Sequence, residues 1–249
     1  MEKIKISAVS YLNTLPFIYG IEQDLELLNQ IELSKDMPSE CARKLIDGEV
    51  DLGLIPVAAI PELAESHIIS DYCIGAVGKV KSVLLLSNVP IEKIETIYLD
   101  YQSRTSVKLC RILCEHHWKV KPVFLNSEAG YEQKIEGNTA GVIIGDRTFY
   151  LEKKYSHQYD LAEEWQKMTG LPFVFAAWVS NRKLPAEFVE EFNKAIYLGV
   201  NDIELVVNNQ EELTIPRRVL MEYFTKNISY ELDDEKKEGL KKFLSFLRG

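Results

Sequence analysis

The sequence predicts an α/β protein of two lobes, each a mostly parallel sheet flanked by helices, with a ligand cleft between the lobes. Three observations support this fold class. Short apolar strands alternate with amphipathic helices from the start of the chain. The same alternation begins again near residue 96. Two segments, residues 81–87 and 173–179, are apolar almost throughout, which is typical of strands buried on both faces.

The first predicted strand covers residues 4–9, where apolar and polar side chains alternate. A turn at residues 10–14 follows, and Pro16 then opens a helix, because proline is tolerated in the first helical turn. The βαβ alternation continues with strands over 31–34 and 51–55, a helix over 38–48 and a short helix from Pro56.

The second series of elements begins after the apolar strand at 81–87. It comprises predicted strands over 96–100, 120–125, 141–144 and 173–179 and helices over 103–115 and 161–168. Three amphipathic helices, over 185–207, 217–225 and 234–247, close the chain.

The lobe borders are expected at the two apolar strands, where the chain can cross from one lobe to the other. Lobe one then comprises residues 1–88 and 180–249, and lobe two comprises residues 89–179. Ligands of such folds bind at the carboxyl ends of strands, so we expect the site in the cleft between the lobes.

The composition limits the kinds of partner. The chain has 249 residues, 46% of them apolar, and a net charge of −9 from 29 basic and 38 acidic residues. This balance argues against binding nucleic acid or an anionic membrane through bulk charge, but a local pocket can still hold a small anion. We expect no secretory signal and no membrane span. Four scattered cysteines fit a reducing compartment, so we expect a cytoplasmic protein.

The motifs of metal and cofactor sites are missing from the sequence. The four histidines and four cysteines show no HExxH, CxxC or paired spacing. Neither a GxSxG elbow nor a GxGxxG fingerprint occurs. We therefore expect no metal and no cofactor. Cys110 and Cys114 share the apolar face of a predicted helix, which favours a buried structural role.

A first cluster of polar groups, which includes Ser10, Tyr11 and Asn13, follows the first strand. It lies where a strand ends and a helix begins, a place where α/β folds bind ligands because the first helical N–H groups are unpaired. Two interpretations stay open. The segment binds a ligand, or Asn13 or Thr14 only caps the helix while Tyr11 packs against the other lobe.

A second cluster, Ser103, Arg104, Thr105 and Ser106, precedes the helix over 103–115. Its hydroxyls, guanidinium and N-terminal amides could hold a carboxylate or a phosphate, at about 1.5–3 kcal/mol for each charge-assisted hydrogen bond. The alternative is plain capping with Arg104 in solvent, although three hydroxyls exceed what capping needs. The segment lacks the GxxxxGK[ST] spacing and is not a nucleotide P-loop.

Two further candidates lie at the ends of predicted strands. Asp146 follows the strand over 141–144, and it either contacts the ligand or pairs with Arg147 on the surface. Ser82 begins the apolar strand at 81–87 and is a weaker candidate on the same reasoning.

Five segments together resemble the chorismate dehydratase family, which opens the futalosine route to menaquinone: SAVSYLNTLPF, GEVDLGLIPVAAI, KSVLLLS, YQSRTSVKLCRILC and GLPFVFAAWVSN. The similarity runs over nearly the full length, and YLNTLP is its most specific part. The resemblance implies the fold of type II periplasmic binding proteins.

The resemblance also implies a lyase without a cofactor. Chorismate, a small dianion, would lose its ring hydroxyl as water together with an adjacent ring proton and become 3-[(1-carboxyvinyl)oxy]benzoate. The base is either a protein carboxylate or the substrate's own enolpyruvyl carboxylate. Asn13 would orient the reacting hydroxyl or the base as the catalytic residue. The implied substrate-binding residues are Ser10, Tyr11, Ser82, Ser103, Arg104, Thr105, Ser106 and Asp146.

Two rival functions stay open. A sister enzyme of the same route, the 1,4-dihydroxy-6-naphthoate synthase, shares the fold but carries a Pro-Asn-Asp-Thr-Phe run where this chain has Leu-Asn-Thr-Leu-Pro, and it relies on a histidine. The other rival is an intracellular binding protein that holds a small carboxylate without turnover. The oligomeric state is not readable from the sequence.

Overall fold

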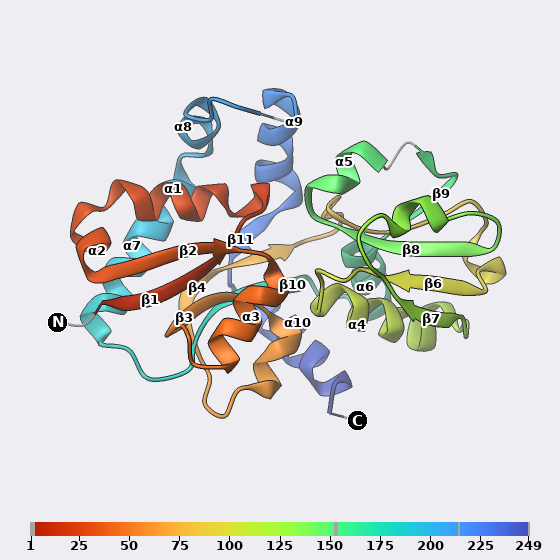
Figure 1. The fold of residues 1–249 in the computed structure, drawn as a ribbon, viewed down its shortest axis with the longest axis horizontal. Helices are drawn as coiled ribbons and strands as arrows, with labels where there is room; N and C mark the ends of the chain where they lie inside the picture. Colours follow the sequence, from red (N-terminus) through yellow and green to blue (C-terminus); the bar gives the residue numbers. More distant parts are fainter. Residues whose placement is uncertain (1–2, 152–153, 214, 249) are drawn as a thin grey trace.

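Two β-sheets, each with helices packed against it, form the two halves of the molecule (Figure 1). The computed structural model describes residues 3–151, 154–213 and 215–248. The first sheet has the strand order β11-β4-β10-β3-β1-β2, and the second has the order β7-β6-β8-β5-β9. The predicted α/β class with two lobes is therefore confirmed.

The first half contains both ends of the described chain (Figure 1). Its strands are β1 (Ile4–Val9), β2 (Ile31–Asp36), β3 (Leu52–Pro56), β4 (His67–Ala76), β10 (Phe173–Ser180) and β11 (Ser229–Glu231). Its helical segments are η1 (Leu12–Thr14), α1 (Leu15–Gln23), α2 (Leu25–Gln30), α3 (Pro38–Ile46), η2 (Val57–Glu62), α7 (Ala186–Asn201), α8 (Ile203–Asn208), α9 (Arg217–Glu222), η8 (Tyr223–Asn227) and α10 (Asp234–Phe246).

The second half is built from the middle of the chain. Its strands are β5 (Val83–Ser87), β6 (Thr96–Leu99), β7 (Val123–Asn126), β8 (Thr139–Ile144) and β9 (His157–Asp160). Its helical segments are η3 (Ile91–Lys93), α4 (Thr105–Ile112), η4 (Leu113–Trp118), η5 (Tyr131–Lys134), η6 (Gly145–Arg147), α5 (Thr148–Leu151) and α6 (Leu161–Thr169).

Both sheets are mixed: most strands of each run in one direction, and β10, β11 and β5 run in the opposite direction. β1 runs parallel to β2 and β3, and β6 runs parallel to β7 and β8. In contrast, β10 is antiparallel to β3 and β4, and β5 is antiparallel to β8 and β9. A parallel neighbour needs a crossover connection, usually a helix, whereas β5 and β10 arrive directly from the other half of the molecule.

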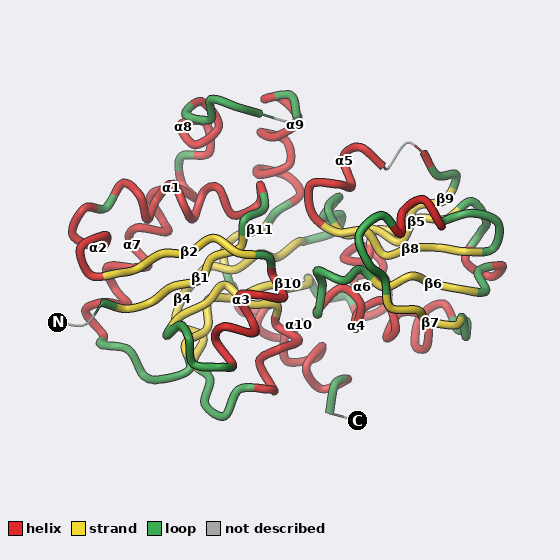
Figure 2. Tube along the Cα trace, viewed as in Figure 1, coloured by secondary structure: helices red, strands yellow, loops and turns green. Residues whose placement is uncertain are grey.

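The two apolar strands lie in the sheets opposite to those expected. β5 is part of the second sheet, and β10 is part of the first (Figure 2). The connections between the halves are therefore residues 77–82 and 170–172, and we propose these as the lobe borders in place of 1–88, 180–249 and 89–179. An apolar run indicates burial on both faces, but it does not say in which sheet the strand lies.

β5 is buried on both faces, as its composition predicts. Val83 and Leu85 pack into the main core, and Leu84 and Leu86 pack into a smaller cluster on the other face with Tyr131. Successive side chains of a strand point to opposite faces, so a strand covered on both sides must be apolar at every position.

The structure contains three strands that the sequence analysis did not predict: β4, β9 and β11. It also divides the predicted helix over 185–207 at Asp202, whose side chain caps α8 by accepting a hydrogen bond from the Leu205 N–H. The helix over 103–115 passes into the π-helical turn η4. All four cysteines are buried and free, which agrees with the structural role predicted for Cys110 and Cys114.

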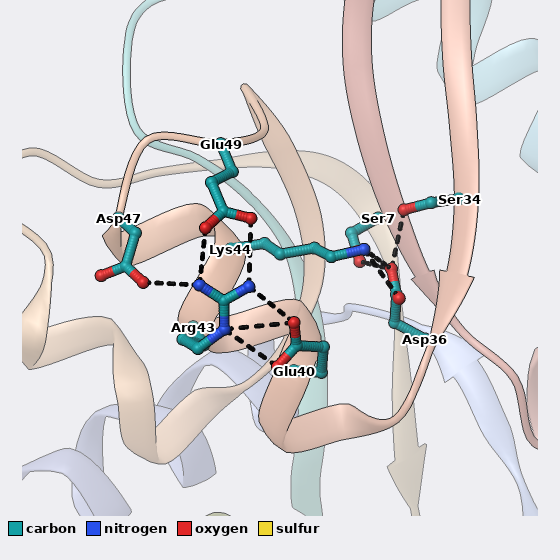
Figure 3. Close-up of polar contacts among 8 residues, drawn as sticks. All are labelled: Ser7, Ser34, Asp36, Glu40, Arg43, Lys44, Asp47 and Glu49. Carbon is teal, nitrogen blue, oxygen red and sulfur yellow. Dashed lines mark hydrogen bonds and ion pairs between the residues drawn. The ribbon is translucent and has the colours of Figure 1, made fainter.

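A polar network fixes the carboxyl end of β1 beside α3 (Figure 3). Asp36 Oδ2 accepts hydrogen bonds from Ser7 (2.8 Å), Ser34 (2.7 Å) and Lys44 (2.7 Å). Burial acts to raise the pKa of Asp36, but these hydrogen bonds hold it below its ordinary value. The Asp36 carbonyl also accepts from the Ser10 N–H at 3.0 Å, so the network anchors the start of the loop after β1. Arg43 on α3 joins three further carboxylates, those of Glu40, Asp47 and Glu49.

Candidate functional site

A narrow cavity of about 60 Å³ lies between the two halves of the molecule. The first half contributes Val9, Tyr11, Asn13, Thr14, Pro38, Pro56, Ile74, Phe175 and Ala176. The segment from residue 80 and the second half contribute Val80, Ser82, Val83, Ser103, Thr105, Ser106, Ile144 and Gly145. The wall is thus apolar with a few convergent hydroxyl and amide groups, as small-molecule sites commonly are.

Asn13 lies in η1, between β1 and α1, and is held there by its backbone. The Tyr230 hydroxyl donates to the Asn13 carbonyl at 3.0 Å. The next residue, Thr14, donates its hydroxyl to the carbonyls of Val9 (2.6 Å) and Tyr11 (2.7 Å). The side-chain oxygen of Asn13 is buried and has no hydrogen-bond partner. An unpartnered buried acceptor costs free energy unless a ligand satisfies it.

The capping interpretation of this segment does not match the geometry. Thr14, the N-cap residue of α1, makes no side-chain capping bond, and neither does Tyr11, the N-cap residue of η1. The Asn13 side chain lines the cavity.

Ser82 lies in the connection between the halves, directly before β5. It is almost fully buried, and its carbonyl accepts a hydrogen bond from the Gly145 N–H at 2.9 Å. Its hydroxyl lies 2.7 Å from the hydroxyl of Tyr223, which comes from η8 near the end of the chain. Tyr223 was not among the predicted site residues. Only its tertiary contact with Ser82 distinguishes it from the other apolar positions of its helix.

The three hydroxyls at the start of α4 have different partners. Ser103 caps the helix by accepting a hydrogen bond from the Ser106 N–H at 3.0 Å. Thr105 joins the two halves, because its hydroxyl accepts from the Ala58 N–H (3.2 Å) and donates to the Phe175 carbonyl (3.0 Å). Ser106 is buried and lines the cavity. The capping and ligand-binding interpretations are therefore compatible, because Ser103 caps as an acceptor and keeps its own proton.

Tyr11 and Asp146 connect the loop after β1 to the second half. The Tyr11 hydroxyl donates to Gln102 Oε1 at 2.7 Å. The Asp146 carboxylate accepts from the Leu12 N–H at 3.3 Å, and burial raises the pKa of this carboxyl to about 6. A β-carbon on Gly145 would come within 3.0 Å of the Tyr11 ring, so a glycine permits this close approach.

Three predicted residues lie away from the cavity wall. Ser10 is exposed, and its N–H is bound to the Asp36 carbonyl. Arg104 pairs with Glu62 across the halves at 2.9 Å. Asp146 lies behind the Tyr11 loop rather than on the wall. The structure brings together Tyr11, Asn13, Ser82, Ser103, Thr105 and Ser106.

The described residues contain no cluster of three or more potential metal ligands among His, Cys, Asp and Glu. Within the same ranges, no helix is both long enough and apolar enough to cross a bilayer.

Two curated proteins similar to this chain are chorismate dehydratases. The protein of Thermus thermophilus is 25% identical over 234 residues, which cover 85% of this chain and 84% of the relative. The protein of Campylobacter jejuni is 26% identical over 256 residues, which cover 95% and 94% of the two chains.

Solved structures of low sequence identity share the fold. A protein of Archaeoglobus fulgidus superposes with a TM-score of 0.75 at 17% identity, covering 99% of this chain and 97% of its own. A Candida albicans gene product, described as having the generic periplasmic binding protein fold, superposes with a TM-score of 0.66 at 12% identity and covers 98% and 91%. The periplasmic-binding-protein-like fold is thereby confirmed. A family model described as menaquinone biosynthesis matches residues 4–248, and the chain therefore belongs to that family.

Proposed function

We propose that this protein is a chorismate dehydratase, a lyase that needs no cofactor and converts chorismate to 3-[(1-carboxyvinyl)oxy]benzoate and water. Menaquinone biosynthesis by the futalosine route would begin with this step, in the cytoplasm. The two similar chorismate dehydratases support the proposal at about 25% identity. One observation carries it: among the described lining residues of this apolar cavity, the Asn13 oxygen is the one buried side-chain acceptor without a partner.

The first turn of α4 supplies donors for a carboxylate. Ser103 and Ser106, in and directly before this turn, both line the cavity. Ser103 accepts its capping bond and can still donate its own proton. The helix dipole favours negative charge at this end. We assign this end to a substrate carboxylate, and we assign Thr105, whose hydroxyl is fully engaged, to lobe contact instead.

The reaction is an elimination that balances without a redox partner. The bond from the ring to its hydroxyl breaks, and so does the C–H bond on the neighbouring ring carbon that carries the enolpyruvyl ether. The electron pair of that C–H bond becomes the third double bond of the ring, and the proton leaves with the hydroxyl as water. Because the product ring is aromatic, the enzyme needs only to orient the substrate and stabilise the departing hydroxyl.

We propose that the substrate's own enolpyruvyl carboxylate takes the ring proton. The described residues that line the cavity include no aspartate, glutamate, histidine or lysine. Asp146, a carboxyl group with a raised pKa, does not line the cavity, and it accepts a hydrogen bond from the Leu12 N–H. The enolpyruvyl carboxylate is linked through the vinyl carbon and the ether oxygen to the ring carbon that loses the proton, so it is within reach without a contribution from the protein.

The cavity must widen to admit the substrate. At about 60 Å³ it is smaller than ligand pockets of about 300 Å³ or more. The walls belong to different lobes that are joined by two connections, so a separation of the lobes is the simplest way to open the site. Closure would then exclude water from the departing hydroxyl.

Incubating the purified protein with chorismate, after treatment with a chelator, tests the proposal. We expect loss of one water by mass spectrometry and the appearance of an aromatic benzoate spectrum. The matched control is Asn13→Ala, which should bind chorismate but turn it over far more slowly. Bound but unchanged chorismate would indicate the binding-protein rival, and absence of binding would favour the naphthoate synthase rival or another carboxylate.

A further inference from the structure

We propose that Tyr223 is a positioning residue that directs the Ser82 hydroxyl proton into the cavity, so that Ser82 and Asn13 together hold the substrate's ring hydroxyl. Ser82 would donate to this hydroxyl, and the Asn13 side-chain oxygen would accept from it. This inference rests on the proposed dehydratase function and goes beyond it by assigning a role to a residue outside the cavity wall.

The contact between the two hydroxyls carries the inference. Tyr223 is 1% exposed, and its hydroxyl lies 2.7 Å from Ser82 Oγ. Burial raises the pKa of Tyr223 well above its ordinary value, so the phenol stays protonated and can donate. A serine hydroxyl has a single proton. When Ser82 accepts from Tyr223, that proton is free to point along the remaining direction, toward the cavity that Ser82 lines.

Asn13 completes the arrangement from the other side. The polar contact with the Asn13 side chain opposes the rise in the pKa of Tyr223, so this side chain lies beside the phenol. The amide oxygen of Asn13 is then left without a partner, and it is buried at the cavity. Tyr223 thus faces both groups that we assign to the ring hydroxyl, and it donates to Ser82.

This pair of groups selects a hydroxyl rather than a carboxylate. A hydroxyl both donates and accepts, and it can satisfy one acceptor and one donor at the same time. A carboxylate only accepts, so it would leave the Asn13 oxygen unsatisfied and would be repelled by it. We therefore place the ring hydroxyl at Asn13 and Ser82, and a carboxylate at the first turn of α4.

The location of Tyr223 explains how its hydroxyl is kept in place. The residue begins the π-helical turn η8, directly after α9. Its ring packs edge-to-face on Phe149 from the second half, with ring centroids 5.0 Å apart. Single π-helical turns are frequent at functional sites. The C-terminal segment thus places a proton donor behind the connection between the lobes.

Tyr223→Phe removes the hydroxyl and keeps the ring. We expect kcat to fall about tenfold to a hundredfold, because the donor to the departing hydroxyl is no longer oriented, while KM and the melting temperature change little. The matched control is Tyr159→Phe, which removes a tyrosine hydroxyl that accepts from the Ile91 N–H far from the cavity. An unchanged kcat in Tyr223→Phe would overturn the inference.

Ser82→Ala provides a second and independent test. If Tyr223 acts through Ser82, then Ser82→Ala lowers kcat to a similar extent, and adding Tyr223→Phe to it has no further effect. Full activity of Ser82→Ala, or losses that multiply in the double variant, would overturn the inference even if Tyr223→Phe did not fold. If the unmodified protein binds no chorismate or leaves it unchanged, the proposed function itself fails. If the unmodified protein and both variants turn chorismate over equally well, only the inference about Tyr223 fails.

Discussion

Asn13 is the residue on which the proposed chemistry depends most. The polar segment after β1 was expected to contain either a ligand site or a helix cap, and neither N-cap residue, Tyr11 or Thr14, makes a side-chain capping bond. The residues of this segment were therefore predictable as site candidates from their position at the end of a strand. Tyr223 and Tyr230 were not, although they contact Ser82 and the Asn13 carbonyl, because they lie more than 200 residues away from Asn13 in sequence.

Replacing Asn13 by alanine should separate function from stability. We expect kcat/KM for chorismate to fall about a hundredfold or more, because the acceptor for the ring hydroxyl is lost. The free energy of unfolding should change by less than about 1 kcal/mol, since the removed oxygen has no partner in the folded protein. Urea unfolding and steady-state kinetics measure the two quantities. The control is Asn208→Ala, at an exposed position of α8. A large loss of stability in Asn13→Ala would point to a structural role for Asn13.

Asp146 should make the stability of the protein depend on pH. Burial raises the pKa of its carboxyl to about 6 in the folded protein, above its ordinary value of 3.8. The folded state therefore binds a proton more tightly than the unfolded state, and the contribution of this group is lost as the pH rises from about 4 to about 6. We expect Asp146→Asn to be more stable than the unmodified protein at pH 8, by on the order of 2 kcal/mol.

Thermal unfolding of both proteins between pH 4 and pH 8 checks this prediction. The difference in stability should shrink toward the acid end, where Asp146 itself is protonated. A constant difference across this range, or a variant that is less stable at pH 8, would show that the charge of Asp146 does not oppose folding.

At the scale of elements, a helix or strand was predicted correctly where its own residues carry a clear apolar pattern. β1 and α3 carry periodic apolar patterns, β5 and β10 are apolar almost throughout, and the structure contains all four close to the predicted bounds. β4 was missed although it is the partner of both β10 and β11. Its first half alternates only weakly between apolar and polar residues, and its pairing is interrupted by register shifts, so its strand conformation depends on its neighbours.

The packing of α1 on α7 depends on two glycines that face each other. A β-carbon on Gly20 would lie 1.9 Å from the Ala195 carbonyl oxygen, and one on Gly199 would lie 1.8 Å from the Pro16 carbonyl oxygen. These contacts are with backbone, which cannot move aside as a flexible side chain can. The two helices therefore approach closely at this point, and α1 is fixed directly behind the loop that carries Asn13.

We expect Gly20→Ala to destabilise the protein by about 1–3 kcal/mol or more, because the methyl group would force the two helices apart. Calorimetry or urea unfolding measures the loss. Gly48→Ala is the control: its β-carbon would meet nothing within 4 Å, and only its positive φ of 72° opposes the change. If Gly20→Ala costs no more than the control, the close approach does not limit the packing.

At the scale of the whole molecule, the cavity exists only because two sheets meet. Contacts across the halves surround it: Tyr11 with Gln102, Leu12 with Asp146, Arg104 with Glu62, and Thr105 with both Ala58 and Phe175. Several residues predicted to bind substrate thus also make contacts that hold the lobes together. Their positions at strand ends and helix starts predict that they lie near the cleft, but the same positions suit contact with a ligand and contact with the other lobe equally.

Thr105→Val tests the lobe contact. Valine has nearly the same shape, but it leaves the Ala58 N–H and the Phe175 carbonyl without their partner. Each unsatisfied buried group costs about 1–3 kcal/mol. We expect a lower melting temperature and a higher KM for chorismate, since the closed arrangement is destabilised. Thr105→Ser keeps the hydroxyl and should restore both; equal effects of the two variants would show that the methyl group, not the hydroxyl, matters.

The sequence by itself determined the α/β class, the two-lobed plan and the polar segments at 10–16 and 101–106, because apolar periodicity, strand ends and helix starts are local properties of the chain. Only the tertiary structure decided the strand directions, the sheets to which β5 and β10 belong, and the partners of each hydroxyl. These depend on residues that are distant in sequence. The contact of Tyr223 with Ser82, across 141 positions, forms only when the C-terminal helices pack behind the connection between the lobes.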